Sequence, residues 1–451
     1  MGRGVALSGV LALACFAVAL GNNLGAVDQT PFHPDETRWL NRAHYLRDYL
    51  DPFGPTWDDA YLTRGQPPMG SYLMGAALLL QGRDLQTNGM WDFRYDFAWN
   101  RARGFGGDPA DRRAGRRANA VVGALAVAAG FLAGARLTNR VGGVLGALFL
   151  AFHPLAIELG SQAVSDALLA LLLALALLAA FALADRPSWP RALLLALLLG
   201  LGGATKLTPL LLTVPLAGLG LIGCRTSDVG RAGAGGTTLT VLPPPSSVLS
   251  RLRLSRLPTP NFRLLSLPLL AFVVFVAAYP YLWPDPVGRT ANVFAFRSLE
   301  MRRHETNWPD VAVGDRQEAV LRLWTTLNVR RTAGRELSER LGLAWDGRGW
   351  DLRLAAAGAL LLTALAIRHG PRSGHALVLV LLGGQVAALV LGMRVDFDRY
   401  HLPTVLAAAV ATGVLGGGAW WGVARLARAI APRLRPAAIR PPPEAAGTGA
   451  R

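Results

Sequence analysis

The sequence contains a series of apolar segments that are long enough to cross a lipid bilayer, which takes about 20 consecutive apolar residues. We place ten spans along the chain, at 5–24, 118–136, 141–159, 163–184, 191–204, 207–223, 264–282, 352–368, 375–393 and 402–420. Only 17% of the 451 residues are charged, whereas about 25% is usual for a soluble protein. The sequence therefore predicts an all-α, polytopic membrane protein with about ten transmembrane helices.

Positive charge is distributed unevenly over the loops between these spans. With the N-terminus in the cytoplasm, the cytoplasmic segments hold 19 arginines and 3 acidic residues. The outer loop 25–117 holds 12 basic and 12 acidic residues, and the outer loop 283–351 holds 11 and 10. The positive-inside rule therefore predicts a multi-pass cell-membrane protein with both termini in the cytoplasm. The net charge of +17 reflects this orientation, so we exclude nucleic-acid binding.

The spans and outer loops form one expected domain, residues 1–423. The cytoplasmic loop 224–263 is rich in Gly, Pro, Ser and Thr, and the basic tail 424–451 is rich in Pro. Such compositions predict disorder. The first apolar run lacks a clear small-residue cleavage site, so we interpret it as a retained span. Cys15 and Cys224 are expected near opposite membrane faces, which predicts no disulfide framework.

Tryptophan is concentrated in the two outer loops, which hold nine of the twelve. One interpretation is an aromatic belt at the membrane interface. The other is a set of stacking platforms for a sugar or a lipid. The nine are Trp39, Trp57, Trp91, Trp99, Trp283, Trp308, Trp324, Trp345 and Trp350.

The first outer loop begins with an apolar and charged pattern at helical spacing. Residues 37–50 place apolar side chains on one face and Arg38, Arg42 and Arg47 on the other. This pattern predicts an amphipathic helix that lies in the membrane interface. The apolar stretch Ser71–Leu80 follows a Gln66–Gly70 step that contains two prolines. It is short for a span, so we expect a re-entrant or surface helix.

Two adjacent carboxylates, Asp35 and Glu36, stand at the start of the helix expected in the first outer loop. Pro34 suits the first position of a helix, and the positive helix end favours ionised carboxylates. One hypothesis is that such a carboxylate acts as a general base at the membrane surface. The alternative is that both residues only complement the helix dipole.

Taken together, these motifs resemble the GT-C glycosyltransferases, and among them the protein O-mannosyltransferases and aminoarabinose transferases. The Asp-Glu pair after the first span and the Pro-Pro step resemble two of the family's motifs. Further motifs stand at the starts of later spans or between them. These are Arg116–Gly123, Ser161–Leu169 with Asp166, Gly202–Lys206 and Asp398–Pro403. The resemblance covers most of residues 1–420.

The resemblance implies an enzyme that transfers a hexosyl or pentosyl group from a polyprenyl-phosphate donor to an acceptor hydroxyl outside the cytoplasm. It implies Asp35 as the general base, with Glu36 beside it, and inversion at the anomeric carbon. The acceptor would be a protein, a lipid or a glycan. Lys206 and Arg399 are the implied contacts to the donor phosphate, with Tyr400 adjacent to Arg399. The alternatives are that Lys206 only snorkels to the outer interface, and that Arg399 only forms a surface ion pair with Asp396 or Asp398.

Further site residues follow from the same resemblance. Family members often carry His or Lys before the Pro-Pro step, where this chain has Gln66, and Arg64 could substitute. Arg116 is expected either to lock the first loop onto the bundle or to touch the donor. His33 and His304 are candidate loop contacts, although His304 also belongs to a charged cluster typical of a solvated face.

No ligand spacing in the sequence demands a metal, so we expect no cofactor, although a divalent metal remains compatible with the acids near His33. The chief alternative to a transferase is a transporter or lipid flippase. Transporters place charges at mid-span near broken helices, whereas this chain has long outer loops with an acid pair at a helix start. A membrane scaffold without catalysis is the third interpretation.

Overall fold

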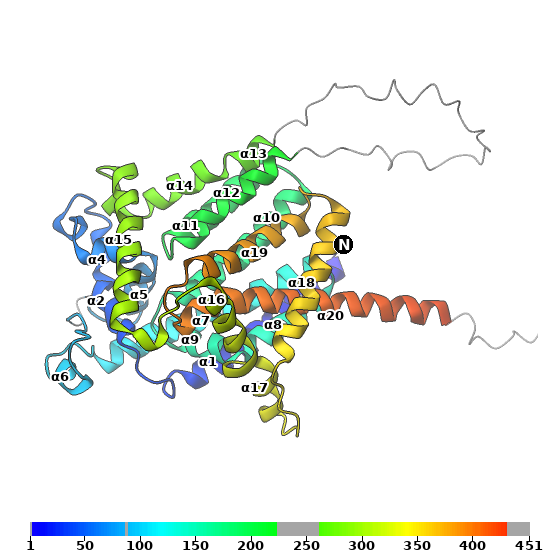
Figure 1. The fold of residues 1–451 in the computed structure, drawn as a ribbon, viewed down its shortest axis with the longest axis horizontal. Coiled ribbons are helices and arrows are strands. Elements are labelled where there is room, and N and C mark those ends of the chain that lie inside the picture. The colour runs from blue at the N-terminus through cyan, green and yellow to red at the C-terminus, as the bar shows by residue number, and fades with distance from the viewer. Residues whose placement is uncertain (1, 86–88, 223–260, 431–451) are drawn as a thin grey trace, which may run out of the picture.

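The computed structural model describes residues 2–85, 89–222 and 261–430, and these residues form a helical bundle (Figure 1). Within these ranges no β-strand is present, and the one β-bridge joins Ala312 to Val395. The prediction of an all-α fold is confirmed. The expected cytoplasmic loop, apart from its last three residues, and Cys224 lie outside the described ranges.

Six helices of the described chain are long and apolar enough to cross a membrane, and a bent pair raises the number to seven. The bent pair, α8 and α9, turns by 63° at His153. The long helices are α1 (Gly2–Ala26), α7 (Pro109–Leu137), α10 (Asp166–Asp185), α18 (Trp350–His369), α19 (Gly374–Gly392) and α20 (Leu402–Ile430). The pair is α8 (Arg140–Phe152) with α9 (Pro154–Ser161). The chain is therefore a multi-pass membrane protein.

The three remaining predicted spans are helical but shorter than a full crossing. They are α11 (Trp189–Gly203), α12 (Thr208–Leu221) and the pair α13 (Phe262–Leu265) and α14 (Leu267–Ala277). The expected hairpin between α11 and α12 is present, because α11 ends at Gly203 and α12 begins at Thr208. This turn places Lys206 at the end of the bundle that carries the outer loops.

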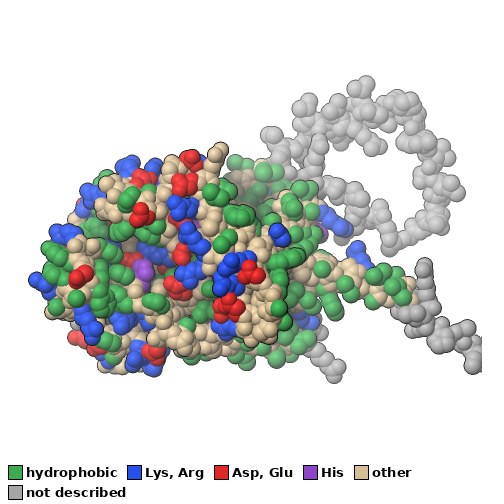
Figure 2. Space-filling model, turned by 60° about the horizontal axis from the view of Figure 1, so that its bottom comes forward, with side chains coloured by type: hydrophobic (Ala, Val, Ile, Leu, Met, Phe, Trp, Pro, Cys, Tyr) green, Lys and Arg blue, Asp and Glu red, His purple; other side chains and the backbone are tan. Residues whose placement is uncertain are grey.

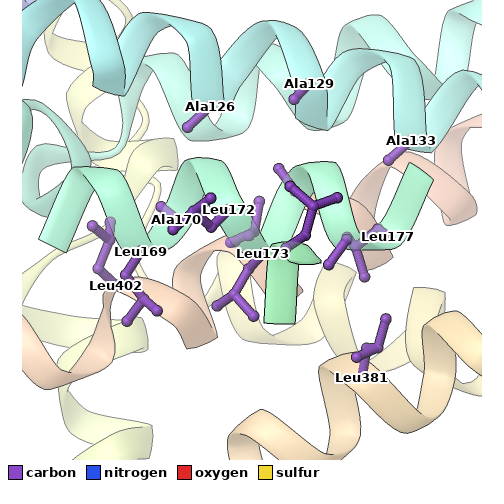
Figure 3. Packing of buried hydrophobic residues seen from close by; sticks show 14 of the residues in the cluster. Ala126, Ala129, Ala133, Leu169, Ala170, Leu172, Leu173, Leu177, Leu381 and Leu402 are labelled. Atoms are coloured by element: carbon purple, nitrogen blue, oxygen red, sulfur yellow. The ribbon is translucent and has the colours of Figure 1, made fainter. Parts of the chain in front are cut away.

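The centre of the bundle is packed from small and branched side chains of neighbouring helices. Figure 3 shows alanines of α7 facing leucines of α10, with Leu381 of α19 and Leu402 of α20 close by. Alanines at this spacing let the two helix backbones approach closely, which is the usual basis of helix packing in membranes. The long helices therefore form a rigid support for the loops at their ends.

The outer loops gather at one end of this support. Figure 1 shows α2, α4, α5, α6 and α15 at this end, and the N-terminus and the C-terminal part of α20 at the other. Figure 2 shows positive and negative side chains mixed over much of the face it presents, with a histidine in a hollow. The helices of the first loop are α2 (Pro34–Asn41), α3 (Tyr45–Asp48), α4 (Tyr61–Gly65), α5 (Met69–Leu80) and α6 (Phe97–Ala102). The short turns η1 (Arg42–His44) and η2 (Pro55–Trp57) connect them.

The second outer loop is also mostly helical. Its main element, α15, is followed by shorter helices that lead back to the bundle at α18. The elements are η5 (Pro280–Leu282), α15 (Pro286–Asn307), η6 (Pro309–Val311), α16 (Arg316–Thr325), η7 (Thr326–Arg330), which is a π-helix, and α17 (Ala333–Arg340). A final turn, η8 (Asp398–His401), precedes α20.

Two expectations are corrected in these regions. The amphipathic helix expected at 37–50 is divided into α2, η1 and α3, and Arg42 is buried rather than on the solvent face. Arg42 is buried because its guanidinium donates to the carbonyls of Leu62 and Gln66 and so holds the loop together. Helix α20 continues to Ile430, past the expected tail boundary at 424.

Helices α18 and α20 approach so closely that a side chain at Gly358 would overlap the carbonyl oxygen of Ala411. We expect Gly358→Ala to destabilise the protein by about 1–3 kcal/mol, the usual cost of overpacking. Thermal unfolding in detergent measures this effect. Gly383→Ala in α19 is the matched control, since no atom lies within 4 Å of the added carbon. Equal melting temperatures for the two variants would contradict the packing described.

Candidate active site at the loop end of the bundle

Glu36 joins the first outer loop to the helix bundle. Its side chain is fully buried, and its carboxylate accepts four hydrogen bonds. Two come from the Arg116 guanidinium at 2.7 and 2.8 Å. The backbone N–H of Ala163 donates the third at 2.9 Å, and that of His33 donates the fourth at 3.1 Å. The residues that meet at Glu36 come from α2, α7 and the segment between α9 and α10.

Arg116 uses all five of its N–H groups in this contact region. Besides the two bonds to Glu36, it donates to the carbonyls of Val27 at 2.6 Å, Thr30 at 2.9 Å and Pro31 at 3.1 Å. No N–H group of Arg116 is left to bind a sugar donor. Of the two roles expected for Arg116, the geometry therefore favours the one that locks the loop.

Asp35 directly precedes Glu36 at the start of α2, but its side chain contacts a different partner. Its side chain is buried, and its carboxylate forms an ion pair with Arg399 of η8. The Asp35 backbone N–H donates to Nδ1 of His33 at 3.1 Å, which caps the helix. Burial, together with the Arg399 charge, lowers the pKa of His33. His33 is therefore neutral near pH 7, which matches the acceptor role of its Nδ1.

Asp35 lines a cavity of about 350 Å³ between α2, α9, α15 and η8, which we name the Asp35 cavity. Its wall combines carboxylates, guanidinium groups, the two histidines His33 and His304, and aromatic rings. The lining side chains include Asp35, Arg38, Phe93, Glu158, Gln162, Arg297, Glu300, His304, Trp308, Asp398 and Arg399. Such a mixed polar and aromatic wall suits a hydroxyl-bearing ligand.

A second cavity of about 300 Å³ lies on the other side of Arg399, and we name it the Lys206 cavity. Ends of α12, α19 and α20 form much of its wall, so many of its side chains are apolar. The apolar residues include Leu207, Leu211, Ala388, Leu389, Met393 and Pro403. The polar residues include Asp166, Lys206, Arg394 and Tyr400. This wall suits a ligand with an apolar chain and a charged head.

The two cavities share three wall residues, Gln66, Arg297 and Arg399. Arg399 is the most informative of them because it also pairs with Asp35. Its turn is held in place on both sides. Asp398 pairs with Arg331 at 3.1 Å, and His401 bonds Asp396 at 2.6 Å. The guanidinium of Arg399 therefore stands at a fixed boundary between the two cavities.

Lys206 reaches its cavity from the turn between α11 and α12. It forms an ion pair with Asp166 at the start of α10, and its ammonium lies 5.5 Å from the ring centre of Tyr400. The Tyr400 hydroxyl is buried and has no hydrogen-bond partner among the described residues. The structure thus brings Lys206 close to Arg399 and Tyr400, which are distant from it in the sequence.

Gln66 and Arg64, the two candidates before the Pro-Pro step, differ in position. Gln66 lines both cavities, and its side-chain oxygen accepts a hydrogen bond from Arg42 at 2.7 Å. Arg64 lines neither cavity, because it pairs with Asp59 at 3.2 Å and stacks on Phe296. The expectation that Arg64 substitutes at the phosphate contact is therefore not supported.

Sequence reasoning missed Arg297 and Glu300 of α15, which both line the Asp35 cavity and form an ion pair. With His304 they follow the spacing i, i+3, i+7, so they share one helix face. That spacing is visible in the sequence and could have identified the face. Burial lowers the pKa of His304, so its imidazole is neutral near pH 7.

Within residues 2–85, 89–222 and 261–430, no three or more His, Cys, Asp or Glu side chains are grouped so that they could hold a metal ion.

The buried Glu36–Arg116 pair generates a stability prediction. Removing one partner of a buried ion pair typically costs about 3–5 kcal/mol. We therefore expect Arg116→Met to lower the melting temperature in detergent strongly. Arg113→Met is the control on the same helix, since its pair with Asp28 is exposed and such pairs contribute at most about 1 kcal/mol. Comparable losses in both variants would contradict the anchoring role.

Comparison with known families gives one match, over part of the chain. The profile of the family described as dolichyl-phosphate-mannose-protein mannosyltransferase matches residues 108–233. The matched segment contains three of the motifs noted in the sequence, at Arg116–Gly123, Ser161–Leu169 and Gly202–Lys206. No curated protein sequence matches the chain.

Solved structures give matches along most of the chain at low identity. The oligosaccharyltransferase of Archaeoglobus fulgidus in complex with Zn and sulfate has 12% identity and a TM-score of 0.49, over 93% of this chain and 51% of that one. ArnT from Cupriavidus metallidurans bound to undecaprenyl phosphate has 17% identity and a TM-score of 0.45, over 95% of this chain and 64% of that one. The chain thus spans about half the length of the former and less than two thirds of the latter. By its family match and its motifs, the chain resembles the protein-mannosyltransferase group of GT-C glycosyltransferases, as its sequence predicted.

Proposed function

We propose that this protein transfers a hexosyl or pentosyl group from a polyprenyl-phosphate donor to a hydroxyl group of an acceptor. The single observation that carries the proposal is the position of Asp35. Its carboxylate lines the Asp35 cavity and pairs with Arg399, which also lines the neighbouring cavity that contains Lys206. The family match at 108–233, to transferases described by a dolichyl-phosphate-linked sugar, supports this chemistry.

The donor is proposed to bind in the Lys206 cavity. Its prenyl chain would lie along the apolar ends of α12, α19 and α20, within reach of the surrounding bilayer. Its phosphate would meet Lys206 and Arg399, while the buried Tyr400 hydroxyl could donate a further hydrogen bond. Cations paired with carboxylates can exchange these partners for a phosphate, which forms charge-assisted hydrogen bonds of similar geometry.

The acceptor is proposed to bind in the Asp35 cavity, with its hydroxyl directed at the Asp35 carboxylate. Asp35 removes the hydroxyl proton as the oxygen attacks the anomeric carbon of the donor. The bond between that carbon and the phosphate oxygen breaks, and its electron pair stays on the phosphate. Lys206 and Arg399 stabilise the growing negative charge. A single in-line attack inverts the anomeric centre.

Glu36 and Arg116 serve this reaction indirectly in the proposal. Their hydrogen bonds are saturated among themselves and neighbouring backbone groups. They therefore act as positioning residues that fix the start of α2 and hence Asp35. The charge distribution of the loops supports a site on the extracytoplasmic face, with both termini in the cytoplasm.

The Asp35→Asn variant tests the base assignment. We expect it to reduce transfer from a radiolabelled polyprenyl-phosphate sugar by roughly a hundredfold or more, because the amide cannot accept the hydroxyl proton. Its elution from a sizing column should match that of the wild type. Asp48→Asn is the matched control, since Asp48 lies in the same loop but lines neither cavity. Full transfer by Asp35→Asn would falsify the assignment, and no transfer by the wild type would favour a transporter.

The Lys206→Gln variant tests the donor site. We expect the KM for the donor to rise about tenfold through the loss of one charge-assisted contact, while the KM for the acceptor stays the same. Steady-state kinetics with each substrate varied in turn separates the two. Arg64→Gln, outside both cavities, should change neither constant. A donor KM that is unchanged in Lys206→Gln would place the phosphate elsewhere.

A further inference from the structure

Arg38 is the one cation in the walls of the two cavities that has no carboxylate within 4.0 Å among the described residues. In the Asp35 cavity, Arg297 pairs with Glu300 and Arg399 pairs with Asp35. In the Lys206 cavity, Lys206 pairs with Asp166 and Arg394 pairs with Glu305 at 3.0 Å. A guanidinium left without a counter-ion in a partly enclosed cavity is costly, since burial removes part of its hydration.

The residues around Arg38 hold its side chain at the cavity wall but do not pair with all of its hydrogen-bond donors. The guanidinium carbon lies 4.9 Å from the ring centre of Phe93 and 5.8 Å from that of Tyr61. The Nε group is buried and has no hydrogen-bond partner in the described chain, and one terminal nitrogen makes only a 3.5 Å contact to the Tyr61 hydroxyl. That hydroxyl in turn bonds Glu300 at 2.9 Å. Arg38 therefore has a buried Nε–H group without a partner in the described chain, and a terminal nitrogen at an exposed position where a ligand can reach it.

The position of Arg38 relative to Asp35 indicates which substrate it faces. Both residues belong to α2 and are three positions apart, so they are neighbours on one helix face, with about 5–6 Å between their Cβ atoms. Both line the Asp35 cavity, and neither lines the Lys206 cavity. Arg38 is thus separate from the proposed phosphate contacts of the donor.

We propose that the acceptor carries an anionic group, a carboxylate or a phosphate, close to its reacting hydroxyl, and that Arg38 binds this group. This inference rests on the proposed function, because it assigns the Asp35 cavity to the acceptor. Arg38 then determines acceptor specificity. A planar guanidinium forms bidentate bonds with such anions, and the ring of Phe93 lies against the Arg38 guanidinium in the cavity wall.

The test measures the binding of small acceptor mimics to the purified full-length protein, by isothermal titration calorimetry. The probes are methyl β-D-glucuronide and glucose 6-phosphate, each compared with methyl β-D-glucoside. We expect at least one anionic probe to bind about tenfold more tightly than the neutral glucoside. The preference should disappear in Arg38→Gln, be retained in part in Arg38→Lys, and persist in Lys206→Gln.

Two results would overturn the inference. One is equal binding of all three probes to the wild type. The other is a preference that survives in Arg38→Gln or is lost in Lys206→Gln, because the anion would then occupy the donor site. The assay needs no turnover, so its failure leaves the transferase proposal intact. Conversely, Asp35→Asn tests the transfer reaction without bearing on the anion preference.

Discussion

The structure of the candidate site depends on the buried ion pair between Glu36 and Arg116. Burying two charges carries a large desolvation cost unless their remaining hydrogen-bonding capacity is used. Here the carboxylate accepts four hydrogen bonds and the guanidinium donates five. The pair therefore fixes the start of α2 against α7. Because Asp35 precedes Glu36 directly, its carboxylate is held in the cavity wall by a neighbour that makes no contact with the cavity.

The cations that line the two cavities differ in whether a carboxylate is paired with them. Arg399 and Lys206 each stand against a carboxylate, so the apolar wall around them contains no isolated charge in the described chain. In the proposal, an arriving phosphate is bound by these same cations, which have further N–H groups to donate to its oxygens. Arg38 differs because no carboxylate of the described residues lies within 4.0 Å of its guanidinium. In the proposals above, Lys206 and Arg399 therefore bind the donor phosphate, and Arg38 binds the acceptor.

Much of the fold could be predicted from the sequence, because span length and loop charge are local properties. Ten apolar segments are helical, and the hairpin at Lys206 forms where glycines interrupt the run. Asp35 and Lys206 were found because each stands in a short motif. The burial of Arg42 and the position of Arg64 could not be read from helical periodicity, since contacts between segments distant in the sequence decide both. Arg297 was missed because its role depends on where α15 lies.

A structure of the protein with decaprenyl phosphate bound, determined by electron cryomicroscopy, would show directly where the donor phosphate binds. We expect the phosphate between Lys206 and Arg399, about 3 Å from both nitrogen groups, with the prenyl chain along α12 and α19. Asp35 should then face the vacant Asp35 cavity. A phosphate bound at the opposite end of the bundle, or separated from Asp35 by a wall of side chains, would show that these residues do not form the donor site.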